Sequence, residues 1–254
     1  MIKFFRNIRQ KMLTENKFSK YLIYALGEII LVVIGILIAL QINNWNQDRI
    51  EHKETKVLLS NLKLDIVANI SKLKEQQNGL RQRKEWADFV LKSLKEQRVA
   101  DSAMFITAIT RVGWIIDYSQ SFPTYNEIVS SGKLSYIKSE SLKKALANYQ
   151  TQVEDYWQII SSYNLGLKET ERLAIGHLNG MPEGSNVENL NHAILNKEVR
   201  FNLSSIAEDT EFYKSVKHIS FYTSVNIDYI SSIIITKAEE LENLIIYELK
   251  TYGE

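Results

Sequence analysis

The stretch YLIYALGEIILVVIGILIALQI, residues 21–42, contains one charged residue and no proline in 22 positions. An α-helix of this length rises about 33 Å at ~1.5 Å per residue, which is enough to cross a hydrocarbon core of roughly 30 Å. The stretch therefore predicts one transmembrane helix near the N-terminus, and the rest of the chain is interpreted relative to it.

Charge on either side of the span predicts its orientation. The 20 residues after it hold three cations and three anions, whereas the first 20 hold one anion, Glu15, and six cations: Lys3, Arg6, Arg9, Lys11, Lys17 and Lys20. Because an excess of Lys and Arg marks the cytoplasmic side, we expect a cytoplasmic N-terminus and an exported C-terminal part.

An uncleaved anchor is favoured over a signal peptide. The apolar run is longer than a signal-peptide core, and its exit, ALQINNWN, offers no small-x-small cleavage site. Tyr21 and Tyr24 at one end and Trp45 at the other occupy positions typical of interfacial aromatic residues. The preceding residues 2–13 alternate basic and apolar side chains, which suits either a short amphipathic helix on the inner leaflet or a solvated basic segment.

Glu28 lies about 10 Å inside the apolar run. Gly35 and Ala39 share its face of the helix, and a stripe of small residues with one polar group suits close helix association. Three interpretations stay open: self-association or docking on another membrane protein, an ion-linked role, or a glutamate that reaches the interface or bonds Tyr24.

The composition of residues 43–254 excludes several classes of function. The chain has no cysteine, so disulfides, thiolate metal sites and cysteine catalysis are excluded. This part carries 25 Lys and Arg against 28 Asp and Glu, a net charge of −3, which disfavours binding to nucleic acid. Two prolines in the whole chain favour long helices.

Helical spacing of apolar residues recurs along the exported part. It predicts long helices over 45–97, with a weak point at Gly79, over 140–177 and over 210–251. The second carries a heptad stripe: Leu142, Leu146, Tyr149, Val153, Tyr156, Ile160, Tyr163 and Leu167. The third repeats apolar residues in steps of 3, 4 and 4.

Shorter elements are expected between the long helices. Residues 102–118 and 187–207 are predicted to be helical. Thr124 and Glu127 form a capping-box pattern, and Gly132 suits the position after a helix end, which together predict a helix of two turns. The predicted fold class is all-α, with a basic segment at 1–20, a transmembrane helix at 21–42, and an elongated antiparallel helical bundle at 43–254.

A search for catalytic and metal-binding patterns finds none. The four histidines, His52, His177, His192 and His218, lack metal-ligand spacing, and His177 suits the C-terminal end of a helix. Nucleotide-binding and hydrolase motifs are absent, so we expect no enzymatic activity and no cofactor.

Aromatic residues are dense between positions 114 and 157. If residues 121–138 fold over the bundle, some of these rings line a ligand pocket; otherwise they form part of the core. The aromatic set is Trp114, Tyr118, Phe122, Tyr125, Tyr136, Tyr149, Tyr156 and Trp157. Of these, the residues assigned to the pocket are Trp114, Tyr125, Tyr136, Tyr156 and Trp157.

Two blocks carry a family resemblance: ENKFSKYLIYALGEIILVVIGILIALQINNWN from Glu15, and TYNEIVSSGKLSYIKSESLKKALANY from Thr124. They resemble a family of single-pass membrane proteins of Bacteroidota that is classed as a domain of unknown function. The resemblance implies an envelope location in Gram-negative cells, hence an inner-membrane anchor and a periplasmic bundle. It brings no catalytic residues with it.

Three functional hypotheses follow. The first is a membrane-anchored scaffold or interaction protein that binds itself or another envelope protein. The second is a sensor-like ligand-binding bundle that signals through its transmembrane helix to a partner. The third, an enzyme, is the least favoured because the motif search finds no catalytic pattern.

Overall fold

The computed structural model describes residues 18–115, 121–182 and 187–252, and the chain divides into two compact units, residues 1–56 and 57–254. The first unit contains the beginning of helix α2 (Phe18–Glu96). This helix is long and apolar enough to cross a membrane, and none of its most apolar window is buried inside the described part of the chain. The predicted interfacial cations Lys3, Arg6, Arg9, Lys11 and Lys17 lie outside the described residues.

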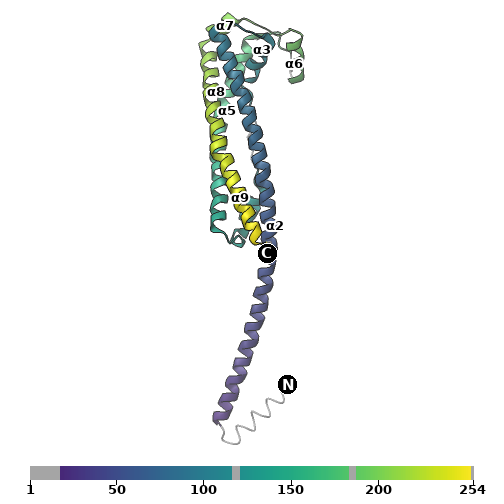
Figure 1. The fold of residues 1–254 in the computed structure, drawn as a ribbon, viewed down its shortest axis with the longest axis vertical. Coiled ribbons are helices and arrows are strands. Elements are labelled where there is room, and N and C mark those ends of the chain that lie inside the picture. The colour runs from purple at the N-terminus through teal and green to yellow at the C-terminus, as the bar shows by residue number, and fades with distance from the viewer. Residues whose placement is uncertain (1–17, 116–120, 183–186, 253–254) are drawn as a thin grey trace. The chain divides into compact units, whose positions relative to one another are not determined.

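The second unit is a bundle of three long helical segments. These are α2 from Val57 onward, α5 (Glu140–Gly176), and a C-terminal segment made of α8 (Thr210–Tyr229), η2 (Ile230–Ile235) and α9 (Thr236–Thr251). Figure 1 shows these helices side by side, with the short helices α3, α6 and α7 at one end of the bundle. The predicted all-α helical bundle is confirmed.

Contacts between the long helices give their directions. Lys74 forms an ion pair with Glu239 at 3.1 Å, and Asp88 accepts a hydrogen bond from Ser220 at 2.7 Å. Since the numbering rises on α2 as it falls on the C-terminal segment, the two run antiparallel. The Tyr163 hydroxyl lies 3.1 Å from the Thr223 hydroxyl, and the rings of Tyr156 and Tyr229 stack, so α5 also runs antiparallel to α8.

The long helices follow the predicted ranges closely. Helix α5 begins after Ser139, whose hydroxyl accepts a hydrogen bond from the Leu142 amide at 3.2 Å, and it ends one residue before His177. Most of its predicted heptad stripe is buried. Helix α2 continues through Gly79 as far as Glu96, as a single long helix requires, and the weaker middle at Gly79 stays a prediction. Gln97 then ends α2 in a left-handed conformation, with φ +53°.

Helix α3 (Ser102–Arg111) is shorter than the predicted 102–118. It ends where Gly113 approaches the backbone of α5. A Cβ atom on Gly113 would lie 2.7 Å from the Leu167 carbonyl oxygen and 2.8 Å from the Glu171 amide nitrogen. The chain therefore leaves the helix at a contact that only a residue without a side chain permits.

Helix α4 (Pro123–Ser130) has the predicted two turns, but its predicted cap is wrong. Phe122 occupies the N-cap position without a side-chain bond, and Pro123 is the first helical residue. The Thr124 amide instead donates to Asp65 of α2 at 2.9 Å, so a distant carboxylate caps α4. Gly132, with φ +72°, follows the helix end as predicted and leads into η1 (Lys133–Tyr136).

The predicted helical region 187–207 is interrupted. It consists of α6 (Val187–Leu195), a two-residue strand β2 (Arg200–Phe201) and α7 (Leu203–Glu208). Strand β2 pairs antiparallel with β1 (Leu178–Asn179), which directly follows α5. This pairing ties the connection after α5 to the start of the C-terminal segment.

Two apolar clusters make up the core. One contains Leu62, Leu73, Leu146 and Leu241, and the other contains Val90, Phe105, Leu167 and Phe212, each with further residues. On α2, buried residues at a spacing of seven form one stripe. The stripe is apolar within each cluster and polar between the two clusters. Its members are Leu62, Asn69, Gln76, Arg83 and Val90.

The π-helical turn η2 interrupts the C-terminal segment. The Thr236 hydroxyl donates to the carbonyl of Ser231, five residues earlier, at 3.2 Å. The wider turn brings Ile234 and Ile235, which are adjacent in sequence, into the core together with Ile230. The predicted stripe of the segment is therefore confirmed in outline, with one turn of different geometry.

Candidate ligand-binding site

A cavity of about 490 Å³ lies between α2, the start of α4 and the middle of α5. Its volume is within the range of ligand pockets in other proteins, roughly 300–1,000 Å³. The residues that line it are Asn69, Ser121, Phe122, Asn126, Tyr149, Gln150, Val153, Glu154, Trp157 and Gln158. All of them belong to the bundle unit.

Aromatic rings form much of the cavity wall. Phe122 stands edge-on to Tyr149, with ring centroids 5.7 Å apart, and stacks on Tyr125 at 5.3 Å. Trp157 lies one helical turn beyond Val153 on α5, and 47% of its surface is exposed. A buried aromatic wall beside a partly exposed indole suits a planar ring that enters from solvent.

Two buried polar atoms lie at the inner side of the cavity. Asn69 is 4% exposed, and within the described residues its amide nitrogen has no hydrogen-bond partner. The Tyr149 hydroxyl is likewise buried without a partner in that part of the chain. Burial raises the pKa of Tyr149 to about 12, a rise that the nearby Asn69 side chain limits, so the phenol stays protonated near neutral pH. The two groups are therefore neighbours behind the surface of the cavity, and the Asn69 side chain acts on the Tyr149 phenol as a hydrogen-bond partner.

The segment over the cavity is held by α2. The Ser121 amide donates to the Asn69 side-chain oxygen at 3.4 Å, and the Thr124 amide donates to Asp65 at 2.9 Å. The Asn69 side chain thus takes part in positioning the segment through its oxygen. Asp65 caps α4 and is not itself among the lining residues.

The charge of the cavity is acidic. Glu154 is the one carboxylate among its lining residues, which include no Lys, Arg or His. The Glu154 carboxylate accepts a hydrogen bond from the Gln150 amide at 2.7 Å on the exposed face of α5. An anionic ligand would meet this carboxylate without a compensating cation.

Of the aromatic residues assigned to a pocket from the sequence, Trp157 lines this cavity, and Tyr125 stacks on Phe122. Phe122 and Tyr149, from the wider aromatic set, also line it, and Tyr118 lies outside the described residues. The others lie elsewhere. The Trp114 ring contacts Arg111 at 5.0 Å, Tyr156 stacks on Tyr229 at 5.4 Å, and the Tyr136 carbonyl accepts a hydrogen bond from Tyr252.

Sequence reasoning missed Asn69, the most deeply buried polar residue of the cavity. A signal was present, because Asn69 falls between Ile66 and Ile70 on the apolar face of a predicted helix. A polar residue in such a position is buried, and a buried amide needs partners for all its polar atoms.

A second buried polar residue, Arg83, lies on the same stripe of α2. Arg83 is 1% exposed, and its Nη2 atom donates to the Trp114 carbonyl. Its side chain also faces Tyr163, whose pKa is raised by burial and lowered in part by the Thr223 hydroxyl and the guanidinium. Arg83 thus connects α2 to α5 and to the turn after α3, and we assign it a structural role.

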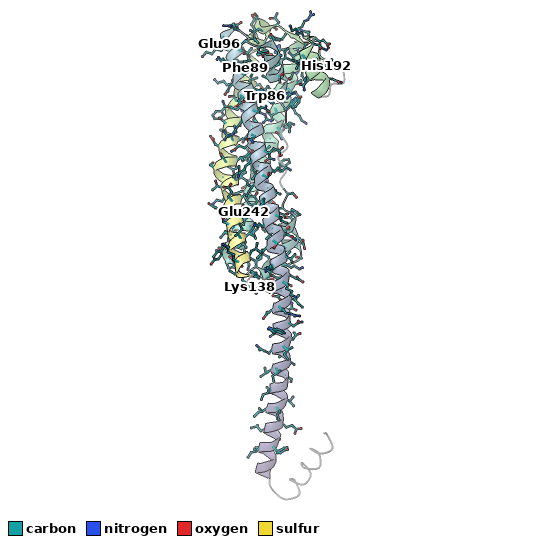
Figure 2. All side chains as sticks on the ribbon, turned by 45° about the vertical axis from the view of Figure 1, so that its right-hand side comes forward. Trp86, Phe89, Glu96, Lys138, His192 and Glu242 are labelled. Atoms are coloured by element: carbon teal, nitrogen blue, oxygen red, sulfur yellow. The ribbon has the colours of Figure 1, made fainter. Side chains whose placement is uncertain are left out.

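The histidines form no metal centre in the described residues, where no group of three or more His, Asp or Glu gathers. His177 ends α5 as predicted, and its Nε2 atom lies 2.8 Å from the Asp209 carboxylate. Asp209 caps α8 by accepting the Glu211 and Phe212 amides. Figure 2 labels Trp86, Phe89 and His192 toward one end of the bundle, and Lys138 and Glu242 toward the other.

The predicted association residues Glu28, Gly35 and Ala39 lie on α2 within the first unit, as do Lys20, Tyr21, Tyr24 and Trp45. Nothing in the described structure lies within 4 Å of a Cβ built on Gly35. A hollow of about 630 Å³ is lined by Ile23, Tyr24, Gly27, Glu28, Leu31 and Val32. The association stripe remains a hypothesis.

Comparisons with known proteins place the chain in a family. No curated protein and no solved structure matches it. Residues 28–182 match the family of unknown function DUF6090, and this range includes every residue that lines the cavity. Because the match covers more than half of the chain, the protein belongs to the DUF6090 family of unknown function.

Proposed function

We propose that this protein is a membrane-anchored, non-enzymatic binding module of the cell envelope, whose helical bundle takes up a small molecule in the cavity between α4 and α5. The observation that carries the proposal is a cavity of about 490 Å³ with an aromatic wall formed by Phe122, Tyr149 and Trp157.

The apolar helix supports the membrane anchor. Its most apolar window is uncovered in the described structure, whereas the core helix of a soluble protein would be buried. Together with the basic N-terminal segment, it supports a single-pass protein of the inner membrane with the N-terminus in the cytoplasm and the bundle in the periplasm. A ligand-binding bundle in that position is sensor-like, and its signal would pass through the transmembrane helix to a partner protein.

A scaffold role is the second candidate, and it is favoured by the uncovered small-residue stripe on the span. The open space at Gly35 would let a second helix approach closely. In-cell crosslinking of Gly35→Ile and of Val33→Ile, on the opposite face, tests this role. We expect the first variant to lose crosslinks between copies or to a partner, and the second to keep them; equal crosslinking of both would contradict the role.

A thermal-shift screen of the full-length protein in detergent micelles tests the ligand-binding proposal. A chemically diverse fragment library should yield compounds that raise the melting temperature, since a ligand of the folded state stabilises it by RT ln(1 + [L]/Kd). The same compounds should have no effect on a Trp157→Ala variant. If no compound stabilises the parent, or if every active compound stabilises both forms equally, the cavity is not a ligand site.

Membrane topology has its own test. A reporter that is active only in the periplasm, fused after residue 252, should be active, and the same reporter fused at the N-terminus should be inactive. The reverse pattern would refute the proposed orientation.

A further inference from the structure

Helix α2 carries a regular row of exposed apolar residues after the predicted span. From position 43 to the end of the helix, the large apolar side chains that the structure shows as exposed are Trp45, Ile50, Val57, Leu64 and Val67. Trp45 is assigned to the membrane interface. The other four repeat at heptad spacing, with Ile50, Val57 and Leu64 at position a and Val67 at position d. These four residues are termed the α2 seam.

We propose that the α2 seam pairs with the same seam of a second copy of this chain, as a parallel two-stranded coiled coil that follows the membrane span. The proposal rests on the membrane anchor of the proposed function, and it names the partner that a scaffold role would need. Anchors inserted in one membrane with the same orientation hold the α2 helices of two copies parallel. Confinement to one membrane also raises the effective concentration of each helix for the other.

The helices of the bundle leave the seam uncovered. Within the bundle unit, Leu62 and Asn69 of α2 are buried, whereas Leu64 is 67% exposed and Val57 is 59% exposed. Leu64 follows Leu62 by two residues, which turn an α-helix by about 200°, so the seam faces away from the helices that cover Leu62. Single exposed apolar residues are common on soluble proteins, but a seven-residue repeat of them is typical of a helix that pairs with another.

The two ends of the seam favour a second copy as the partner. One heptad before Ile50, position a is Asn43, which is also exposed. In an in-register parallel pair this amide meets its own copy, and the nitrogen of one can donate to the oxygen of the other. β-branched residues at position a, such as Ile50 and Val57, are typical of two-stranded coils. Position a becomes polar after Leu64, so the pairing ends there: the residues are Ser71, Asn78 and Glu85.

The charges beside the seam are complementary between two copies. In a parallel coiled coil, position g of one helix lies beside position e of the next heptad on the other helix. Arg49 is at g and Glu54 is at e, so two copies bring this cation and this anion together on both sides of the seam. The next such pair, Lys56 and Asn61, brings no like charges together. Lys53 at position d is long enough for its ammonium group to reach toward Glu54 of the second copy.

The chain has no cysteine, so single introduced cysteines can report contacts between copies of the full-length protein. Ile50→Cys, Val57→Cys and Leu64→Cys each place a thiol at position a. Asn44→Cys and His52→Cys are matched controls at exposed positions b and c of the same segment. Two differently tagged copies of each variant are co-expressed, and the isolated membranes are oxidised with copper phenanthroline. A disulfide needs Cα atoms within about 7 Å of each other, so its yield reports which face is in contact.

We expect the three seam variants to form disulfide-linked products that carry both tags, at a yield several-fold above that of the two controls. A charge swap tests the same contact. Val57→Lys in both copies, with Leu64→Cys as the reporter, should lose most of the product, because like charges then meet at position a. A Val57→Lys copy expressed with a Val57→Glu copy should restore it.

Three results would overturn the proposal. Equal yields at seam and control positions would indicate random collision, and no product at any position would show that a second copy does not cover the seam. Products joined only to a different protein would assign the seam to another partner. None of these results decides the proposed function, because the cavity is tested separately through Trp157 and the anchor through the reporter fusions.

Discussion

Replacing Gly113 by alanine should destabilise the bundle, because the added methyl group has no room. The new Cβ would lie 2.7 Å from the Leu167 carbonyl oxygen, 2.8 Å from the Glu171 nitrogen and 2.9 Å from the Glu171 Cβ. Two of these atoms belong to the backbone of α5 and cannot rotate away as a flexible side chain can. Either α5 or the turn after α3 must therefore move, and overpacking of this kind costs about 1–3 kcal/mol.

Gly166→Ala is the matched control for this substitution. Gly166 lies in the interior of α5, and nothing in the described structure lies within 4 Å of a Cβ built there. Alanine is favoured over glycine inside a helix by about 0.5–1 kcal/mol. The same chemical change should therefore destabilise the protein at one position and stabilise it at the other.

The assay is thermal unfolding of the full-length protein in micelles, followed by far-ultraviolet circular dichroism. For a folded unit of about 200 residues, 1 kcal/mol shifts Tm by roughly 2–4 °C. We expect Gly113→Ala to lower Tm by roughly 2–12 °C and Gly166→Ala to raise it by a few degrees. A Gly113→Ala protein with an unchanged or higher Tm would refute the close approach of the α3 turn to α5.

Two further predictions concern helix ends. Gln97 ends α2 with φ +53°, a conformation that glycine adopts without strain, so Gln97→Gly should raise the free energy of unfolding by about 0.5–1 kcal/mol; a lower Tm would contradict this explanation. Asp209→Ala removes the α8 cap and should cost about 1–2 kcal/mol, measured by denaturant unfolding. The bond from the Phe212 amide, with those from His177 and Glu211, lowers the pKa of Asp209 below 3.8. The stabilisation that the Asp209 carboxylate gives to the fold is therefore present above pH 3.8 and is lost as the pH falls through the lowered pKa. The alanine variant lacks this carboxylate, so it should lose less stability than the parent between about pH 4 and about pH 2. Equal acid sensitivity of both proteins would exclude this role of Asp209.

The long helices could be predicted from the sequence because their signals are local. The heptad stripe from Leu142 to Leu167 needs no knowledge of the helix that covers it, and the buried residues of α5 follow that stripe. Ser139 and Gly132 act within a few residues of their own position. Helix α2 continues through Gly79 because the cost of one glycine in a helix, about 1 kcal/mol, is small beside the burial of Leu73 and Leu80 on either side of it.

The short elements could not be predicted because distant residues determine them. Helix α3 ends where Gly113 contacts α5, more than 50 positions along the chain. Helix α4 is capped by Asp65, so the local pattern of Thr124 and Glu127 was misleading. The strand β2 forms because Arg200 and Phe201 pair with Asn179 and Leu178 of β1. In each case a tertiary contact outweighs a weak local preference.

The cavity was only partly predictable for the same reason. The expectation that residues 121–138 cover part of the bundle identified the right region and Trp157. Tyr149 and Tyr156 share the buried stripe of α5, but Tyr149 meets Phe122 whereas Tyr156, two turns further along, meets Tyr229. Which other rings reach the cavity therefore depends on the segment that packs against α5 at each level. Asn69 was missed because a search for catalytic or metal-binding clusters does not detect a single amide.

Asn69 also offers a way to separate a binding role from a structural one. In the absence of ligand, its buried nitrogen lacks a partner in the described structure, and its oxygen makes one long bond of 3.4 Å to the Ser121 amide. Leucine removes the unpartnered nitrogen, which favours stability, but it also leaves the Ser121 amide without its acceptor, which opposes it. Because that bond is long, we expect Asn69→Leu to change Tm by little while it weakens ligand binding. If the variant instead melts several degrees lower, the amide is needed for the fold. If Tm holds and binding falls, the cost of a polar residue at this core position is explained by the molecule that the cavity binds.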